Sequence, residues 1–233
     1  MYVLEDREVI DINKEFLGND PDLEKKIRYL GKITNKVYGE LPSREETFER
    51  FGLMDRKIIL ISLGRNNKVG VLAKSLLEAL EITGLRAIHQ IVMVLDPYLD
   101  PELNRSIRDH PLSKGVRFTS FLPDLVDLIH HSELVISRAG YNIVNEILLT
   151  GTKAILVPES HGGGEQEKRA RSIQADNIRV LIEADVLRNS PGEAIMDFLN
   201  EPMRHISHKF DKYAIGKSII EDLENWKARC RCR

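Results

Sequence analysis

The stretch LVISRAGYNIVNEILLTG, residues 134–151, places residues that could bind a charged ligand where a strand meets a helix. An apolar run ends in Ser-Arg-Ala-Gly, and a helix with apolar residues at helical spacing follows. The unpaired N–H groups and the dipole of a helix N-terminus favour an anion. Glu146 would lie roughly 8 Å farther along this helix, about the reach from the phosphates of a nucleotide to its ribose. The carboxylate could bind paired ribose hydroxyls, or it could be a solvated glutamate on a surface helix.

A glycine-flanked loop, SLGRNNKVG at residues 62–70, follows an earlier apolar run. Gly64 and Gly70 enclose Arg65 and three further polar residues ahead of a helix. Glycine lets backbone amides approach a ligand closely. The loop matches neither the Gly-x-Gly-x-x-Gly fingerprint nor the Gly-Lys-Ser/Thr ending of a Walker loop. It is therefore either a phosphate contact or an ordinary strand-to-helix turn.

A third loop, VPESHGGGEQEKRA at residues 157–170, has three consecutive glycines before Glu165 and Gln166 open a helix. An acid and an amide at a helix start can cap its N-terminus. The same pair can contact sugar hydroxyls, because a carboxylate accepts hydrogen bonds and an amide both accepts and donates them. The residues alone leave both interpretations open.

The elements that would position these loops are apolar strands that alternate with helices. The strands are apolar throughout instead of alternating, which indicates a parallel sheet covered on both faces. Strict alternation of strand and helix then predicts an α/β fold with a doubly wound, Rossmann-like parallel sheet. Ligands bind at the carboxyl ends of the strands in such folds. The predicted strands span residues 57–63, 87–95, 115–121, 133–137, 153–158 and 178–184.

The chain divides into three segments on the same pattern. Residues 1–55 do not fit the strand–helix alternation, and we interpret them as the remnant of another domain and a linker. Residues 56–204 form the α/β domain, and residues 205–233 form a C-terminal helix and tail. The final helix is amphipathic, so it either docks a partner or packs on its own domain.

The composition is that of an ordinary globular protein. Of 233 residues, 42% are hydrophobic and 30% are charged, and the formal net charge is −2. Nucleic acid is a poor partner for a chain without a basic stripe. No apolar run approaches the roughly 20 residues that span a bilayer, so we expect a cytoplasmic protein. Cys230 and Cys232 lack nearby histidines, so neither a metal site nor a disulfide framework is expected.

Three segments together carry a resemblance to a known family. They are FLPDL, then ELVISRAGYNIVNEILLTGTKAILVP, then EQEKRA. This pattern resembles the C-terminal, donor-binding domain of family 28 glycosyltransferases, the MurG-like enzymes with the GT-B fold. The resemblance covers roughly residues 56–200. It implies the C-terminal half of a GT-B fold and binding of a UDP-sugar, with UDP-N-acetylglucosamine favoured, for transfer to an acceptor hydroxyl. It implies no separate cofactor and no metal.

The resemblance also implies roles for individual residues. Glu146 would bind the ribose hydroxyls. The amides of a four-residue turn would face the diphosphate; its members are Ser137, Arg138, Ala139 and Gly140.

The remaining implied contacts lie on three further segments. Glu165 and Gln166 would contact the hydroxyls of the donor sugar. Phe121 and Leu122 would lie against the base. Two residues of the first loop would approach a phosphate, namely Gly64 and Arg65. This loop departs from the Gly-Gly-Ser-x-Gly pattern that is typical of the family.

The catalytic base of such enzymes belongs to an N-terminal, acceptor-binding domain, so no base is assigned in this chain. The resemblance therefore implies that the chain needs an N-terminal acceptor domain or a partner subunit of that kind, through which any membrane contact would be made. Two alternatives remain. The chain could be an enzyme resembling a UDP-sugar hydrolase or a UDP-N-acetylglucosamine 2-epimerase, or it could be a non-catalytic module that binds a nucleotide sugar.

Overall fold

The computed structural model describes residues 1–120, 124–159, 164–173, 176–202, 208 and 210–231. It divides the chain into two compact units. Unit 1 joins the two ends of the chain, Met1–Glu40 and Lys209–Arg233. Unit 2 is the continuous segment Leu41–His208. It contains the whole of the predicted α/β domain, residues 56–204.

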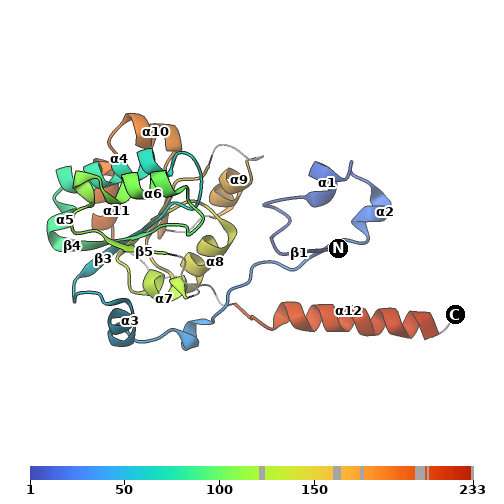
Figure 1. The fold of residues 1–233 in the computed structure, drawn as a ribbon. Helices are drawn as coiled ribbons and strands as arrows, with labels where there is room; N and C mark the ends of the chain where they lie inside the picture. The colour runs from blue at the N-terminus through green and yellow to red at the C-terminus, as the bar shows by residue number, and fades with distance from the viewer. Residues whose placement is uncertain (121–123, 160–163, 174–175, 203–207, 209, 232–233) are drawn as a thin grey trace. The chain divides into compact units, whose positions relative to one another are not determined.

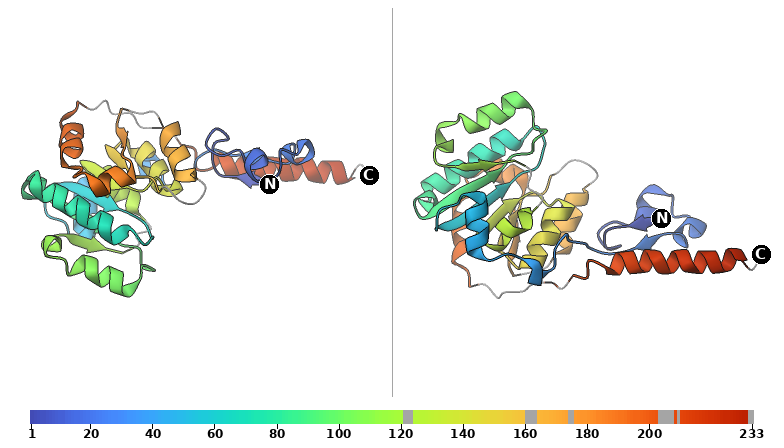
Figure 2. Two further views of the ribbon diagram at one scale, coloured as in Figure 1. Left: turned by 90° about the horizontal axis from the view of Figure 1, so that it is seen from above. Right: turned by 60° about the horizontal axis from the view of Figure 1, so that its bottom comes forward.

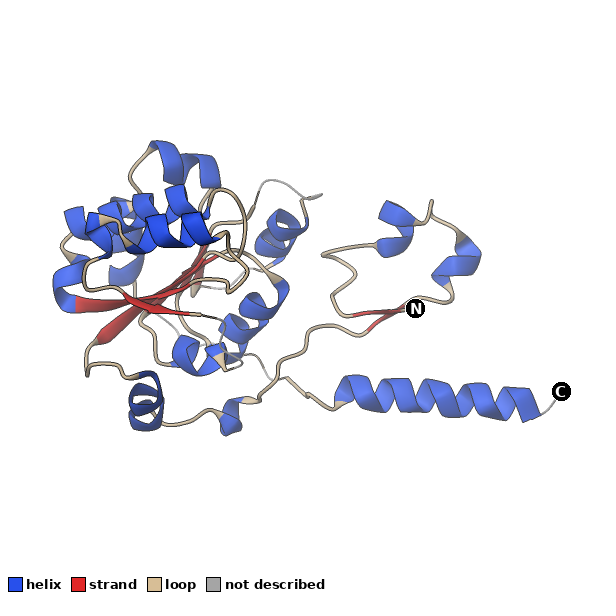
Figure 3. Cartoon of the chain, viewed as in Figure 1, coloured by secondary structure: helices blue, strands red, loops and turns tan. Residues whose placement is uncertain are grey.

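Unit 2 is built on six parallel strands in the order β5-β4-β3-β6-β7-β8. The strand order reverses at β3, since β4 and β5 lie on one side of it and β6, β7 and β8 on the other. Figure 3 shows these strands as a sheet with helices packed around it. The predicted doubly wound parallel sheet is therefore confirmed. The strands are β3 (Lys57–Ser62), β4 (His89–Val94), β5 (Arg117–Thr119), β6 (Leu134–Ser137), β7 (Ala154–Leu156) and β8 (Ile178–Val180).

Continuous apolar runs make these strands because both faces of the sheet are covered. In β3 the side chains of residues 58–61 are all fully buried, although successive side chains point to opposite faces. Ile59 and Ile61 belong to a core with helices α4, α6, α10 and α11. Ile58 and Leu60 point to the opposite face, because side chains alternate along a strand. The helix layer on the other side of the sheet contains α7 and α8 (Figures 1 and 2).

The helices of unit 2 follow the strands in the chain and form these two layers. Helix α4 packs against α6, α10 and α11, and α7 packs against α8. The helices are α3 (Arg44–Phe51), α4 (Val69–Ile82), α5 (Leu85–Ile88), α6 (Pro101–Arg108), the 3-10 turn η2 (Pro111–Ser113), α7 (Leu125–His130), α8 (Tyr141–Thr150), α9 (Glu165–Ser172), α10 (Glu183–Arg188) and α11 (Gly192–Asn200).

Unit 1 holds the first and last segments of the chain together. The Tyr2 hydroxyl and the Arg28 guanidinium both contact the carboxylate of Asp222, at 3.3 and 3.1 Å. The last helix therefore packs with the N-terminal segment. The elements of unit 1 are β1 (Tyr2–Val3), α1 (Ile12–Phe16), α2 (Pro21–Glu24), β2 (Arg28–Tyr29), the 3-10 turn η1 (Tyr38–Glu40) and α12 (Ala214–Arg231).

The boundaries of unit 2, at Leu41 and His208, differ from the domain boundaries expected at residues 55 and 204. Residues 41–55 lie in unit 2, because Phe48 of α3 is buried and the Gln90 side chain donates to the carbonyl of Met54 at 2.7 Å. At the other end, unit 2 extends to His208, whose amide donates to the Leu148 carbonyl.

A buried lysine closes the C-terminus of α11. The Lys153 ammonium, at the start of β7, donates to the carbonyls of Phe198, Leu199 and Glu201 at 2.8, 2.8 and 2.6 Å. The last carbonyls of a helix have no partner within the helix, so this one side chain satisfies three acceptors that would otherwise be orphaned.

We expect Lys153→Met to lower the free energy of unfolding of unit 2 by about 2–3 kcal/mol, because three carbonyls lose their donor in a buried place. Urea unfolding followed by circular dichroism measures the change. Lys74→Met, at a side chain 55% exposed on α4, is the matched control and should change stability by less than about 0.5 kcal/mol. Equal effects of the two substitutions would contradict the capping role.

Candidate functional site

The candidate site lies at the carboxyl edge of the sheet, where the strand order reverses between β3 and β6. Parallel strands bring their carboxyl ends to one edge, and a crevice opens where neighbouring strands send their chains to opposite faces. The loops at this place are residues 63–68 after β3 and 138–140 after β6. The segments that follow β7 and β8 lie at the same edge.

The turn after β6 has the form of an anion site. Ser137 is fully buried, and its hydroxyl donates to the Arg138 carbonyl at 3.0 Å. The Arg138 amide donates to the Ser62 carbonyl at 3.2 Å, which ties this turn to the end of β3. Gly140 is the N-cap residue of α8, and no side chain caps the helix. The helix N-terminus is thus left to other acceptors, as an anion site requires.

The side chain of Arg138 turns inward instead of reaching into solvent. Arg138 is 5% exposed, and its Nη1 donates to the Val157 carbonyl at 3.0 Å. The same nitrogen lies 2.6 Å from Glu183 Oε2. The two other guanidinium nitrogens, Nε and Nη2, are buried without a hydrogen-bond partner in the described part of the chain. Arg138 therefore connects the turn after β6 to the end of β7 and to the start of α10, and two of its N–H groups remain able to donate to a ligand.

Glu183 joins two loops of the edge, since it pairs with cations on both. Its second oxygen, Oε1, accepts from the Lys68 ammonium at 2.5 Å. Lys68 is the N-cap residue of α4, which also begins without a side-chain cap. Glu183 is only 4% exposed. Burial alone would raise the pKa of its carboxyl, but the hydrogen bond from Lys68 and the charge of Arg138 outweigh burial and lower the pKa.

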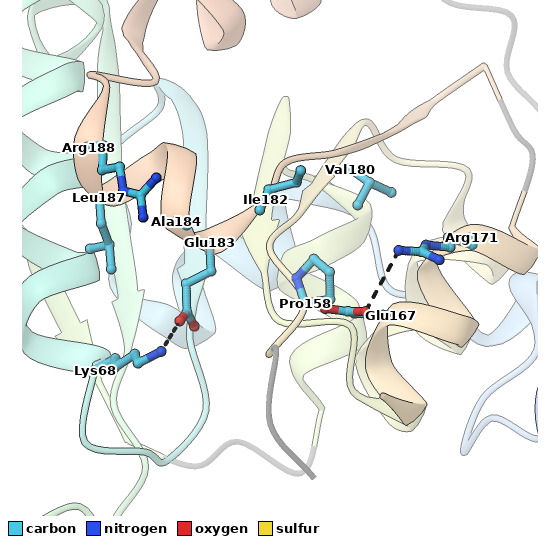
Figure 4. A pocket seen from close by; sticks show the side chains of 10 residues that line it. All are labelled: Lys68, Pro158, Glu167, Arg171, Val180, Ile182, Glu183, Ala184, Leu187 and Arg188. Atoms are coloured by element: carbon cyan, nitrogen blue, oxygen red, sulfur yellow. Dashed lines mark hydrogen bonds and ion pairs between the residues drawn. The ribbon is translucent and has the colours of Figure 1, made fainter. Parts of the chain in front are cut away.

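A pocket of about 360 Å³ opens beside this ion cluster (Figure 4). Its wall combines charged side chains with apolar ones, and Arg171 lies 3.8 Å from Glu167 on one side of it. The pocket is lined by Lys68, Pro158, Glu167, Arg171, Val180, Ile182, Glu183, Ala184, Leu187 and Arg188.

Glu146 lies on α8, well past the turn after β6. Burial raises the pKa of its carboxyl to about 7, and the charge of Asp127 on α7 adds to the shift. Within the described residues no hydrogen bond or cation offsets this cost. Asp127 is itself fully buried and lies 3.2 Å from Arg50 of α3. Of the two interpretations of Glu146, this environment favours a ligand-binding carboxylate over a solvated surface glutamate.

Glu165 and Gln166 open α9, but they do not cap it. The helix has no side-chain cap, and its N-cap residue Gly164 adopts the left-handed backbone with φ of +71°. Gln166 Oε1 accepts from the Glu159 amide at 3.1 Å, which fixes the loop after β7. Glu165 pairs with Arg169 one turn on.

Arg169 links this helix to the turn after β6. It is 2% exposed, and its Nη1 donates to the Ala139 carbonyl at 2.8 Å. The predicted sugar-binding pair and the predicted diphosphate turn are thus brought together by a residue that no sequence signal had marked.

Gly64 and Arg65 lie toward the other side of the edge. Gly64 has φ of +66°, a left-handed backbone conformation that favours glycine. The glycine is therefore explained by the turn itself, with or without a phosphate contact. The Arg65 guanidinium is exposed and lies 5.8 Å from the ring centre of Tyr98, in the segment after β4. Lys68, not Arg65, is the loop cation that the ion cluster connects to the turn after β6. Phe121 and Leu122 lie outside the described residues.

Sequence reasoning missed Lys68, Glu183 and Arg169 as members of this edge. Lys68 stands in the glycine-flanked loop, which was a usable signal. Glu183 and Arg169 are ordinary charged residues in helices, and only the fold brings them to the site.

Among the described ranges, no helix has both the length and the apolar character needed to cross a bilayer.

Comparison with known proteins shows which family this chain matches. The model of the "Glycosyltransferase family 28 C-terminal domain" matches residues 69–220. A UDP-N-acetylglucosamine–N-acetylmuramyl-(pentapeptide) pyrophosphoryl-undecaprenol N-acetylglucosamine transferase of Borreliella burgdorferi is 24% identical over 237 residues, which cover 94% of this chain and 62% of that protein. The corresponding protein of Borrelia garinii is matched over 64% of its length. The chain thus spans somewhat less than two thirds of these relatives.

Solved structures share the fold at low sequence identity. The glycosyltransferase WaaG, involved in lipopolysaccharide biosynthesis, superposes with a TM-score of 0.55 at 17% identity, over 86% of this chain and 53% of that one. UDP-GlcNAc 2-epimerase from Neisseria meningitidis, bound to UDP-GlcNAc, gives 0.56 at 18% identity, over 78% and 49%.

The raised pKa of Glu146 makes stability depend on pH. The folded pKa of about 7 lies above the unfolded value of 4.5, so the folded chain holds this proton more tightly. The associated stability is complete below pH 4.5 and is lost as the pH rises to about 7. Glu146→Gln should therefore raise the free energy of unfolding at pH 8 by up to about 2–3 kcal/mol.

Urea unfolding at pH 5 and pH 8 measures this effect. The gain from Glu146→Gln at pH 8 should shrink toward pH 5, where the wild-type carboxyl is largely protonated in the fold. A variant equally stable at both pH values relative to the wild type would show that Glu146 is solvated and ionised.

Proposed function

The chain belongs to the family of glycosyltransferase family 28 C-terminal domains, and from this premise we propose that it binds a UDP-sugar as the donor of a glycosyl transfer. The donor that we favour is UDP-N-acetylglucosamine, because the names of the Borreliella and Borrelia relatives specify that sugar nucleotide. The acceptor group is a hydroxyl.

One observation supports the proposal above the others: Glu146 is a half-buried carboxylate with a raised pKa and no partner in the described part of the chain, on the same helix as an uncapped N-terminus. A buried charge that nothing neutralises is costly. Two hydroxyl donors of a ribose would satisfy both of its oxygens, while the N-terminus of α8 would accept the diphosphate of the same nucleotide. The ribose and the diphosphate of one nucleotide could therefore each find a binding group on α8.

The chemistry that this half would supply is stabilisation of a leaving group. In the transfer, the acceptor hydroxyl attacks the anomeric carbon, the bond from that carbon to the diphosphate oxygen breaks, and UDP leaves with the electron pair. Negative charge grows on the diphosphate as the bond breaks. Uncapped helix N-termini and the Lys68 cation would stabilise it most in the transition state. The hydroxyl proton passes to a base, which we assign to the acceptor-binding part of the enzyme.

We propose that a separate N-terminal acceptor-binding domain completes the enzyme. The chain spans 62% and 64% of the length of two relatives that carry the whole transferase activity in their names. In this proposal that domain supplies the acceptor site and the catalytic base, and the present chain supplies the donor site.

Isothermal titration calorimetry with UDP-N-acetylglucosamine, UDP and GDP tests the proposal. The wild type should prefer the uridine ligands, and Glu146→Ala should weaken their binding roughly ten- to a hundredfold, because a buried bidentate contact is lost. Glu78→Ala, an exposed carboxylate on α4, should leave the affinity unchanged.

Absence of binding by a folded wild type would overturn the donor-binding proposal. Incubation with UDP-N-acetylglucosamine alone separates the alternatives: a hydrolase would release free sugar and an epimerase would change its stereochemistry, whereas a donor domain should leave it intact.

The affinity for UDP-N-acetylglucosamine should also rise with pH. If the ribose hydroxyls bind the ionised Glu146, whose pKa is about 7 in the free chain, the competent fraction grows about tenfold between pH 6 and 8, and the affinity grows with it. The sugar nucleotide is preferred to UDP as the probe, because a terminal phosphate titrates near pH 6 and would add its own pH dependence. Glu146→Gln should bind weakly with a flat profile, and a flat wild-type profile would contradict the role of this carboxylate.

A further inference from the structure

The ion cluster at the sheet edge has more donors than acceptors. Lys68 and Arg138 contribute two positive charges, and Glu183 contributes one negative charge between them. Arg138 keeps two buried nitrogens without a hydrogen-bond partner in the described chain. Such groups are rare and destabilising in folded proteins. The cluster therefore has a net positive charge and unused donors at the place where the two uncapped helices α4 and α8 begin.

The two cations differ in their freedom to leave Glu183. Arg138 is 5% exposed and is tied to the Val157 carbonyl. The Lys68 side chain is 35% exposed, its ion-pair partner in the described part of the chain is Glu183, and it carries its charge on a flexible four-carbon stem. Lys68 can therefore swing toward an anion in the crevice, while Arg138 stays in place and keeps Glu183 paired.

We propose that Glu183 is a positioning residue that holds Lys68 at the crevice and competes with the diphosphate of the donor for it. This inference rests on the proposed function. In the free chain Glu183 takes the place of an anion next to Lys68. On binding, the diphosphate takes Lys68, and Glu183 remains paired with Arg138. When the nucleoside diphosphate product leaves, Glu183 recaptures the ammonium, which weakens product binding and favours release.

The direction of the mutational effect distinguishes this competition from a structural role. Loss of a structural ion pair at a binding site loosens the site and lowers affinity. Loss of a competitor frees Lys68 and raises affinity. Glu183→Gln should therefore bind UDP about three- to thirtyfold more tightly than the wild type, because a charge-assisted hydrogen bond no longer has to be exchanged.

The experiment is a double-mutant cycle followed by isothermal titration calorimetry with UDP. Lys68→Met should lower the affinity for UDP about tenfold. Glu183→Gln should give no gain in the Lys68→Met background, because the competition acts through that ammonium. Glu167→Gln, which neutralises another carboxylate in the same pocket, is the matched control and should change affinity less than about twofold.

Three outcomes would overturn the inference alone: a lower UDP affinity of folded Glu183→Gln, an equal gain in the Lys68→Met background, or an equal gain from Glu167→Gln. If the wild type does not bind UDP, the proposed function falls together with this inference.

If Glu183→Gln does not fold, the wild type still answers the question. The Lys68 ammonium should give a protected NMR signal because of its bond to Glu183, and saturating UDP should shift it. Lys68→Arg assigns the signal. An unshifted signal at saturation would show that Glu183 keeps its lysine and does not compete.

Discussion

Burial of the central sheet on both faces is the constraint on which the rest of this structure depends. In β3 four consecutive side chains are fully buried, and β6 is buried along its whole length. The backbone groups of these strands can be satisfied only within the parallel ladder, and the side chains only by helices on either side. Polar chemistry is therefore confined to the ends of the strands. The reversal of strand order at β3 then selects, among those ends, the crevice between β3 and β6.

Charges at this edge are arranged at a cost to stability. Among the described residues, the half-buried Glu146 lies near another carboxylate, Asp127, without a cation of its own, and Arg138 keeps two donors unpaired. A sequence selected for stability alone would place neither there. Both groups become reasonable if a ligand with hydroxyl donors and anionic oxygens completes the site. Arg169 shows the opposite device, since it is buried and paired, and it aligns α9 with the turn after β6.

Unit 1 brings the two ends of the chain together outside the α/β domain. Asp222 of α12 binds Tyr2 and Arg28, so the last helix belongs with the first 40 residues. The same helix leaves Ile220, Leu223 and Trp226 more than half exposed.

The fold class, and the strand–helix unit that carries the turn after β6 and Glu146, could be predicted from the sequence. Continuous apolar strands can pack only in a sheet covered on both faces, and the Ser-Arg-Ala-Gly turn and Glu146 lie within one strand–helix unit, so local spacing was enough to relate them. Glu165 and Gln166 could be singled out from the sequence, but the sequence left open whether they cap α9 or contact a sugar. The structure shows that they do not cap the helix. Only the tertiary structure decided that Lys68, Glu183 and Arg169 belong to the site. Lys68 and Glu183 are 115 residues apart, and such a contact depends on the order of strands in the sheet, which local sequence does not encode.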